Sequence, residues 1–410
     1  MHYIQYCMAN LSTEWLLILL GSVIVISYLF SIISNYIKVP SVLLLLAAGM
    51  ILREITTANQ WHVPLPSHTV DFFGAIGLVM IVLEAGLDLK LGRNKLPLIS
   101  RSFFAAFFIL VLSVTAISTA LYYLLEQPVR DCIVYAIPLS IMSSSIVIPS
   151  LHPLSPDKKE FLVYEASFSD ILGIILFNYF TRSEILTVHA VSVFFFNIFI
   201  AVILSVIFSA LLFLILTKSK MNIKFFLVFA LLIILYEGGK LMGLPSLIII
   251  LFFGLLMNNR QLIRHPRIRA LFFKDKVHEA THLLHSLTAE SSFLVRTFFF
   301  LLFGFSINIH AIFASDILVV GSVVVGILLV VRFLYLRFLL RERVYPEVFF
   351  IPRGLITVLL FYKIPASYHP EKLQGGILFF VVIVTSVIMM LGMIFYKKKE
   401  DEIVEDWSNH

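Results

Sequence analysis

Charged residues and cysteines are both scarce in this sequence. Asp, Glu, Lys and Arg make up 14% of its 410 residues, against about 25% in an ordinary soluble domain. The two cysteines, Cys7 and Cys132, match no CxxC or metal-ligand spacing, so neither a disulfide framework nor redox chemistry is expected. Apolar residues are abundant instead: 60% of the residues are hydrophobic and 39 are Phe. This balance excludes a soluble globular protein and indicates an integral membrane protein.

Long apolar runs separated by short polar segments predict the membrane spans. A spanning helix needs about 20 apolar residues, and fewer where the helix is broken. The N-terminus lacks the basic region of a cleavable signal peptide, so we expect the first run, Trp15–Ile33, to be retained. The fold class is therefore all-α, a polytopic bundle with thirteen predicted spans: 13–34, 39–52, 70–89, 102–125, 131–151, 160–180, 187–217, 223–239, 244–258, 291–309, 314–336, 348–362 and 376–396.

The 31 basic residues predict the orientation, because Lys and Arg collect in cytoplasmic loops. With thirteen spans and a cytoplasmic C-terminus, the inner loops receive most of these residues. The outer loops receive only Arg53, Arg130, Arg182, Lys240, Lys363 and Lys372. We therefore expect an external N-terminus, a transmembrane domain over residues 1–396 and a short cytoplasmic tail over 397–410. The expected location is the plasma membrane, as a multi-pass protein of a prokaryotic cell.

Six charged residues lie well inside the predicted spans, where each needs a partner, a water cavity or a function. A charge at mid-bilayer costs about 2.5–3.5 kcal/mol even on the lenient insertion scale. Acids and bases are equal in number among the six, which favours internal pairing. They are Glu84, Glu165, Asp170, Arg296, Arg332 and Arg353.

Asp170 differs from the other five in depth. Those five lie within about five residues of an inner span end, whereas Asp170 is about ten residues in, near the midplane at a rise of 1.5 Å per residue. Asp170 is also rotated by roughly 140° from Glu165 around their shared helix. We expect Glu165 to form a structural ion pair and Asp170 to face a cavity. A protonated, hydrogen-bonded core carboxyl is the alternative interpretation of Asp170.

Two spans carry residues that interrupt helices. The stretch "PLSIMSSSIVIPSLHP" (138–153) has three consecutive serines, Ser143 to Ser145, followed by prolines, which compete with or remove helical hydrogen bonds. Hydroxyls and freed carbonyls there suit a hard cation. The stretch "VYPEVFFIPRGLITVLLFYKIP" (344–365) contains Pro352 and Gly354. Paired interrupted helices indicate a transporter with inverted repeats and a midplane site, although each interruption alone is also explained by an ordinary proline kink.

The polar segment 260–290 contains His265, His278, His282 and His285. The last three share a helical face, which is compatible with a pH-sensing or metal-binding cluster. The favoured interpretation is a solvated amphipathic linker at the membrane surface.

Five patches, met in order over most of the chain, resemble the monovalent cation/proton antiporter superfamily of the sodium/proton exchanger type. "IVLEAGLDL" (81–89) is similar to the third-span pattern, "SSSIVIP" (143–149) to the first crossing helix, and "EASFSD" (165–170) to the ExxxND motif. "LLVVRF" (328–333) is similar to the arginine-bearing eleventh span, and "PRGLIT" (352–357) to the second crossing helix.

This resemblance implies a role for each charged residue. Asp170 matches the aspartate that binds the cation and the proton, and Glu165 matches the glutamate that pairs with an arginine, here Arg332. Arg296 lies in the span where electrogenic relatives carry a basic residue, and Arg353 matches the arginine of the second crossing helix. Glu84, in the third-span pattern, completes the supporting charges.

Serines replace two elements of the family pattern. Ser169 stands where electroneutral exchangers have Asn and electrogenic ones Asp, and the three serines from Ser143 replace Thr-Asp-Pro. The expected ion-binding set is therefore Asp170, Ser169, Ser143 and Ser144, with Asp170 as the ligand of the monovalent cation. This altered shell leaves the choice among Na⁺, K⁺ and Li⁺ open.

The function expected from these residues is exchange of protons for monovalent cations, electroneutral at 1:1, by alternating access around Asp170. Ions are then substrates, no cofactor, catalytic residue or nucleic acid is expected, and the resemblance implies a homodimer. A sodium-coupled symporter of a small organic anion and a non-transporting ion sensor remain alternatives. A channel would need a repeated carbonyl filter, and an intramembrane hydrolase a second acid or a deep Ser/His pair; the sequence offers neither.

Overall fold

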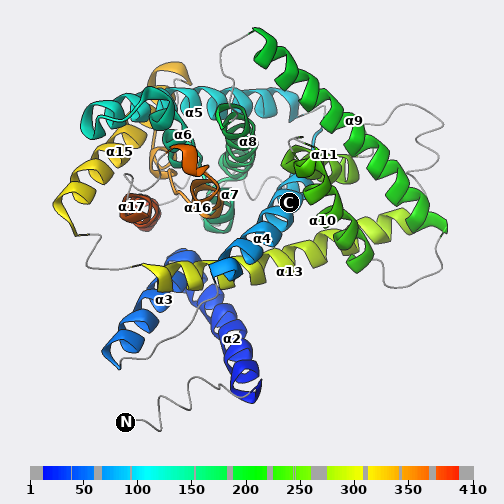
Figure 1. Cartoon of the computed structure of the whole chain (residues 1–410), viewed down its shortest axis with the longest axis horizontal. Helices are drawn as coiled ribbons and strands as arrows, with labels where there is room; N and C mark the ends of the chain where they lie inside the picture. The colour runs from blue at the N-terminus through cyan, green and yellow to red at the C-terminus, as the bar shows by residue number, and fades with distance from the viewer. Residues whose placement is uncertain are drawn as a thin grey trace.

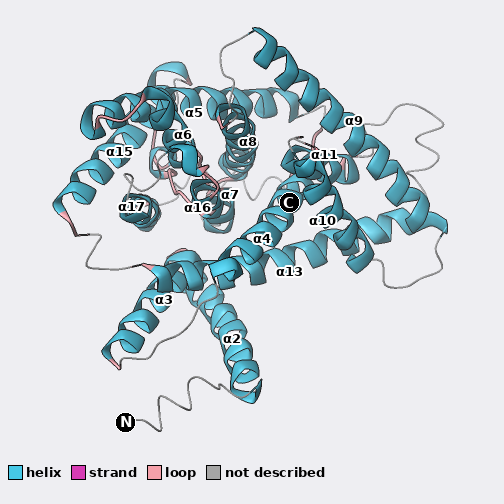
Figure 2. Ribbon diagram, viewed as in Figure 1, coloured by secondary structure: helices cyan, strands magenta, loops and turns pink. Residues whose placement is uncertain are grey.

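The computed structural model describes residues 13–37, 39–59, 67–92, 95–151, 154–181, 188–218, 225–242, 244, 246–259, 275–307, 313–340, 344–368 and 375–396. Within these ranges the chain is helical and contains no strand (Figure 2). The all-α prediction is thus confirmed. Six helical segments are long and apolar enough to cross a membrane by themselves. The multi-pass character is therefore confirmed, while the count of thirteen spans stays a prediction.

The helices form two groups (Figure 1). One group, which we call the crossing bundle, contains α5, α6, α7, α8, α15, α16 and α17, and α5 packs on α6, α8 and α15. Its bounds are α5 Leu96–Leu125, α6 Val129–Ser140, α7 Ser144–Val147, α8 Pro156–Phe180, α15 Ser315–Leu334, α16 Leu355–Tyr362 and α17 Gly375–Ile394. Three short turns belong to it as well: η2 Ile148–Ser150, the π-turn η4 Tyr335–Leu339 and η5 Glu347–Phe349.

The second group, the flanking bundle, packs around α4, α11 and α13. Its helices are α2 Thr13–Ile37, α3 Ser41–Ala58, α4 Ser67–Asp88, α9 Val188–Lys218, α10 Phe225–Leu241, α11 Ser246–Asn258 and α13 Asp275–Ser306. Gly86 of α4 and Gly254 of α11 let these two helices touch, because a Cβ on Gly86 would stand 3.0 Å from the Gly254 Cα and one on Gly254 2.9 Å from the Leu83 carbonyl oxygen. This close pair forms one wall of the space between the bundles.

The structure describes the second half of segment 260–290. Residues 275–290 continue without a break into the predicted span as α13, and Leu284 and Thr288 are buried. Leu283, His285, Ser286 and Glu290 are exposed, so the described end of this segment is an amphipathic helix, and its place at the membrane surface stays a prediction. Residues 260–274, with His265, lie outside the described residues.

Candidate functional site

The first crossing helix breaks where the serines predict. α6 ends at Ser140, and residues 141–143 are extended before α7 begins at Ser144. The Ser140 hydroxyl donates to the Ala136 carbonyl at 2.7 Å, a local bond that competes with helix continuation. Backbone groups that a continuous helix would occupy are therefore left for other partners in the middle of the bundle.

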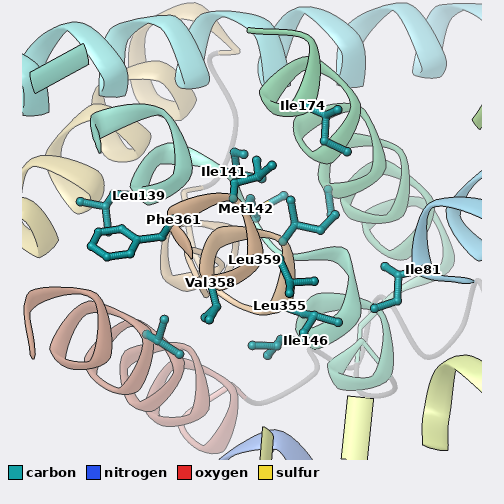
Figure 3. Close-up of a cluster of buried hydrophobic side chains, with 14 of the residues drawn as sticks. Ile81, Leu139, Ile141, Met142, Ile146, Ile174, Leu355, Val358, Leu359 and Phe361 are labelled. Atoms are coloured by element: carbon teal, nitrogen blue, oxygen red, sulfur yellow. The ribbon is translucent and has the colours of Figure 1, made fainter. Parts of the chain in front are cut away.

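The second interruption lies against the first. Residues 350–354 are not helical, and α16 begins only at Leu355. The Ser143 N–H donates to the Pro352 carbonyl at 3.0 Å, which joins the two extended segments. A Cβ at Gly354 would lie 2.8 Å from the Ser143 Cβ and 3.0 Å from Ile146 Cδ1. The crossing therefore needs a glycine there, and apolar side chains such as Ile141, Ile146 and Leu355 pack around it (Figure 3).

Asp170 lies on α8 next to this crossing and is 2% exposed. Its Oδ2 accepts hydrogen bonds from the Ser144 hydroxyl at 2.5 Å and the Ser144 N–H at 3.4 Å. Its Oδ1 is buried and has no hydrogen-bond partner among the described residues. Asp170 lines a cavity between the two bundles whose other walls are apolar: Val82, Ala85, Ile171, Ile174, Leu247, Ile248, Leu251 and Ile356.

Glu165, one and a half turns earlier on α8, points to a different neighbour, as its helical phase predicts. Its two oxygens accept from Arg332 Nη1 at 2.7 Å and Nη2 at 3.0 Å. Both side chains are 1% exposed. A bidentate, fully buried pair is geometrically specific, and removing one partner would leave the other charge uncompensated in the bundle.

Arg353 enters the same region without a carboxylate partner among the described residues. Its Nε donates to the Leu139 carbonyl at 2.6 Å and its Nη1 to the Ile351 carbonyl at 2.9 Å. Both carbonyls flank the helix interruptions. Arg353 shares a second cavity with Glu165, Arg332 and Ser169, so three of the five residues predicted for the inner layer meet there.

The predicted serine ligands occupy different positions. Among the described residues, Ser144 alone of these three serines hydrogen-bonds to Asp170. The Ser169 hydroxyl accepts from the Met142 N–H at 2.9 Å and faces the Glu165 cavity. The Ser143 hydroxyl shares a hydrogen bond of 2.9 Å with that of Ser145. Ser169 and Ser143 thus stabilise the interruption in this conformation.

Glu84 and Arg296 pair with each other in the flanking bundle, with Arg296 Nη2 at 3.2 Å from Glu84 Oε1. One turn further along α4, Asp88 Oδ1 lies 2.8 Å from His285 Nε2 of α13. No group of three or more potential metal ligands occurs among the described residues. His278 and His282 lie on α13, but their side chains lie outside the described set, so the histidine cluster stays a prediction.

Glu347 is a residue that the sequence reasoning missed. Its carbonyl accepts from Arg332 Nε at 2.6 Å, and its carboxylate lies 3.0 Å from Lys158 Nζ at the start of α8. α8 is thus attached at two levels: Glu165 pairs with Arg332 of α15, and Lys158 pairs with Glu347 in the segment that follows α15. The signal in the sequence was an acidic residue among apolar ones in "VYPEVFF", directly before a predicted span.

Comparison with known proteins gives the family. The family model described as "Sodium/hydrogen exchanger, transmembrane" matches residues 21–396. Two solved structures of the sodium proton antiporter MjNhaP1 from Methanocaldococcus jannaschii share the fold. The structure at pH 8 has a TM-score of 0.68 at 16% identity and covers 91% of this chain and 98% of its own. The electron-microscopy structure has a TM-score of 0.65 at 19% identity and covers 95% of this chain and 100% of its own. The search of curated proteins gave no match.

Two interrupted helices that cross beside a buried carboxylate define a secondary transporter. The chain belongs to the sodium/hydrogen exchanger family, which its match over residues 21–396 shows. It is a multi-pass membrane antiporter of sodium ions and protons, not an enzyme, and the ions are its substrates. The resemblance stated from the five sequence patches is confirmed, whereas neither the symporter nor the sensor gains support.

Proposed function

We propose that Asp170 is the residue at which a proton and a monovalent cation compete, with Na⁺ as the first candidate and K⁺ and Li⁺ as further substrates to be ranked. The observation that carries this proposal is the Oδ1 atom of Asp170, which is buried and unpartnered beside a cavity between the bundles. A carboxylate oxygen with no partner in an apolar cavity is unfavourable unless something neutralises it. A proton or a hard cation does so.

Competition produces coupling if the empty, charged carboxylate does not cross the barrier. The crossing bundle carries Asp170 and Ser144, while Val82 and Leu247 of the flanking bundle form the opposite wall. Movement of the first bundle against the second would expose the same carboxylate to each side in turn. The Ser144 hydroxyl, already 2.5 Å from Oδ2, is placed to give a second oxygen to the ion.

The proposed stoichiometry is one proton for one cation. Glu165 is held in a bidentate pair with Arg332, and Ser169 has no ionisable group. Asp170 is then the one carboxylate among the residues described around the cavity that changes occupancy in the cycle. Ser169 and Ser143 belong to the proposed ion-binding region as supports of the interruption that places Ser144.

The proposed arrangement has thirteen spans with inverted repeats, an external N-terminus and a cytoplasmic C-terminus in a prokaryotic plasma membrane. The distribution of basic residues between loops supports this orientation. Residues 1–396 would form the transport domain and 397–410 a cytoplasmic tail. The family resemblance supports a homodimer.

Proton flux in proteoliposomes tests the proposal. A pH-sensitive dye would report flux after addition of Na⁺, K⁺ or Li⁺ to the wild type, to Asp170→Asn and to Asp157→Asn. Asp157 is the matched control, because it lies on the same helix but is exposed. Cation-triggered flux that survives in Asp157→Asn and disappears in Asp170→Asn is the expected result. Flux retained by a folded Asp170→Asn would contradict the assignment.

A further inference from the structure

Lys363 and Tyr236 join the two bundles at one end of the molecule. Lys363 follows α16 of the crossing bundle, Tyr236 belongs to α10 of the flanking bundle, and Lys363 Nζ lies 2.5 Å from the Tyr236 hydroxyl. Tyr236 is 3% exposed. A cationic donor to a buried phenol oxygen is a directed contact, stronger than one between neutral groups.

The same end of the interface is closed by aromatic side chains. Phe303 of α13 lies with its ring centroid 4.2 Å from that of Phe379 on α17 and 6.5 Å from that of Tyr362 on α16. These rings again connect the flanking bundle with the crossing bundle. The proposed topology places this end outside, because α10, α13 and α16 all finish there.

Lys363 lies above the Asp170 cavity. Ile356 lines that cavity, and Lys363 follows it by seven residues, which is two turns on the same face and about 10 Å along the axis. Leu360, one turn above Ile356, is 1% exposed. Lys363 therefore lies about two helical turns beyond the cavity wall, on the side that the proposed topology places outside.

We propose that Lys363, positioned by Tyr236, is an electrostatic gate at the outer end of the cation path. While the hydrogen bond holds, the positive charge repels an approaching cation and the bundles stay together. Opening to the outside requires this bond to break and Lys363 to withdraw. The inference rests on the proposed function of Asp170 and adds an asymmetry to it. Among the described residues, the inner end has no hydrogen bond from a lysine of one bundle to a tyrosine of the other: there the Tyr164 hydroxyl donates to the neutral Lys90 carbonyl at 2.6 Å.

Face-specific kinetics test the gate. Right-side-out and everted membrane vesicles, from cells that express the full chain, would give the apparent KM for Na⁺ at each face. Removing one unit charge about 10 Å from the cavity changes ion binding there by about twofold to fifteenfold, for effective dielectric constants of about 80 to 20. Lys363→Gln is expected to lower the outer-face KM by such a factor and to leave the inner-face KM unchanged. Tyr236→Phe, which removes the oxygen that accepts from Lys363, is expected to shift the outer-face KM in the same direction.

Lys240→Gln is the matched control, because Lys240 lies in the last turn of α10 and is exposed, as Lys363 is, but it is paired with Glu237 at 3.5 Å. It is expected to leave both KM values unchanged. The gate is overturned if either Lys363→Gln or Tyr236→Phe gives no outer-face shift, if the shift is equal at both faces, or if Lys240→Gln reproduces it. A wild type that exchanges no cation at either face would overturn the proposed function instead.

Discussion

The main-chain N–H of Ser143 donates to the carbonyl of Pro352 at 3.0 Å, so two helix interruptions far apart in sequence share a backbone hydrogen bond. An orphan backbone donor is costly in a bilayer, where no bulk water replaces the lost partner. Each interruption is therefore tolerated because the other is present. This shared bond places Ser144, the next residue, against Asp170.

Substitution at the crossing should be poorly tolerated. Gly354→Ala would insert a Cβ 2.8 Å from the Ser143 Cβ, and such overpacking costs about 1–3 kcal/mol. We expect a lower melting temperature in detergent and slower exchange. Gly326→Ala on α15 is the control, because a Cβ there meets nothing within 4 Å. Equal melting temperatures for the two variants would contradict the packing argument.

Glu165 and Asp170 should separate stability from transport. Glu165→Ala leaves Arg332 buried without its carboxylate, which destabilises a protein by about 3–5 kcal/mol. Asp170→Asn removes a charge whose Oδ1 has no partner in the described structure, so the fold should remain intact while exchange is lost. Thermal unfolding and proteoliposome flux, measured on both variants, test whether Glu165 serves stability and Asp170 serves transport. Equal losses of stability and activity in the two would show that the roles are wrongly divided.

Protons should inhibit at low pH by occupying the cation site. If one carboxylate binds either ion, each unit of acidification below the pH of half-protonation raises the apparent KM for the cation by up to about tenfold through mass action. The maximal exchange rate, measured at saturating cation, should not fall as the pH is lowered. Initial rates over a matrix of pH and Na⁺ concentration provide the measurement. A pH effect that saturating Na⁺ does not relieve would argue for separate sites.

Membrane voltage should not drive exchange. A 1:1 cycle moves no net charge, so the equilibrium Na⁺ gradient should follow the pH gradient at every imposed potential. A two-proton cycle would move one charge, and about 100 mV would then shift that equilibrium by about 2.3 kcal/mol, roughly fiftyfold in ion ratio. Proteoliposomes with clamped potentials distinguish the two, and any such displacement would exclude the electroneutral cycle.

Ser144 and Ser169 should behave differently although both were predicted as ligands. Ser144→Ala removes the hydroxyl at 2.5 Å from Asp170 and is expected to raise the apparent KM for the cation. Ser169→Ala removes the acceptor of the Met142 N–H, which costs about 1–3 kcal/mol for a buried unsatisfied donor. Its main effect should be on the melting temperature. A large KM change with unaltered stability in Ser169→Ala would return this serine to the ion's coordination shell.

The sequence by itself determined the class of protein and the exceptional residues. A bilayer penalises charge so strongly that Asp170, Glu165 and Arg332 stand out without any structure, and helical periodicity separates the two acids. The Pro and Ser residues of the interrupted spans also predicted the helix breaks, because they disturb the hydrogen bonds of their own helix whatever its neighbours are.

Only the tertiary structure decided which partners these residues take. Glu84 pairs with Arg296 while Arg353 binds carbonyls of the interruptions, although all three were predicted at one depth. Depth is a local property of a span, whereas pairing depends on which helices are neighbours. The contacts of Glu347 with Arg332 and of Lys363 with Tyr236 join segments whose proximity no spacing along the chain encodes.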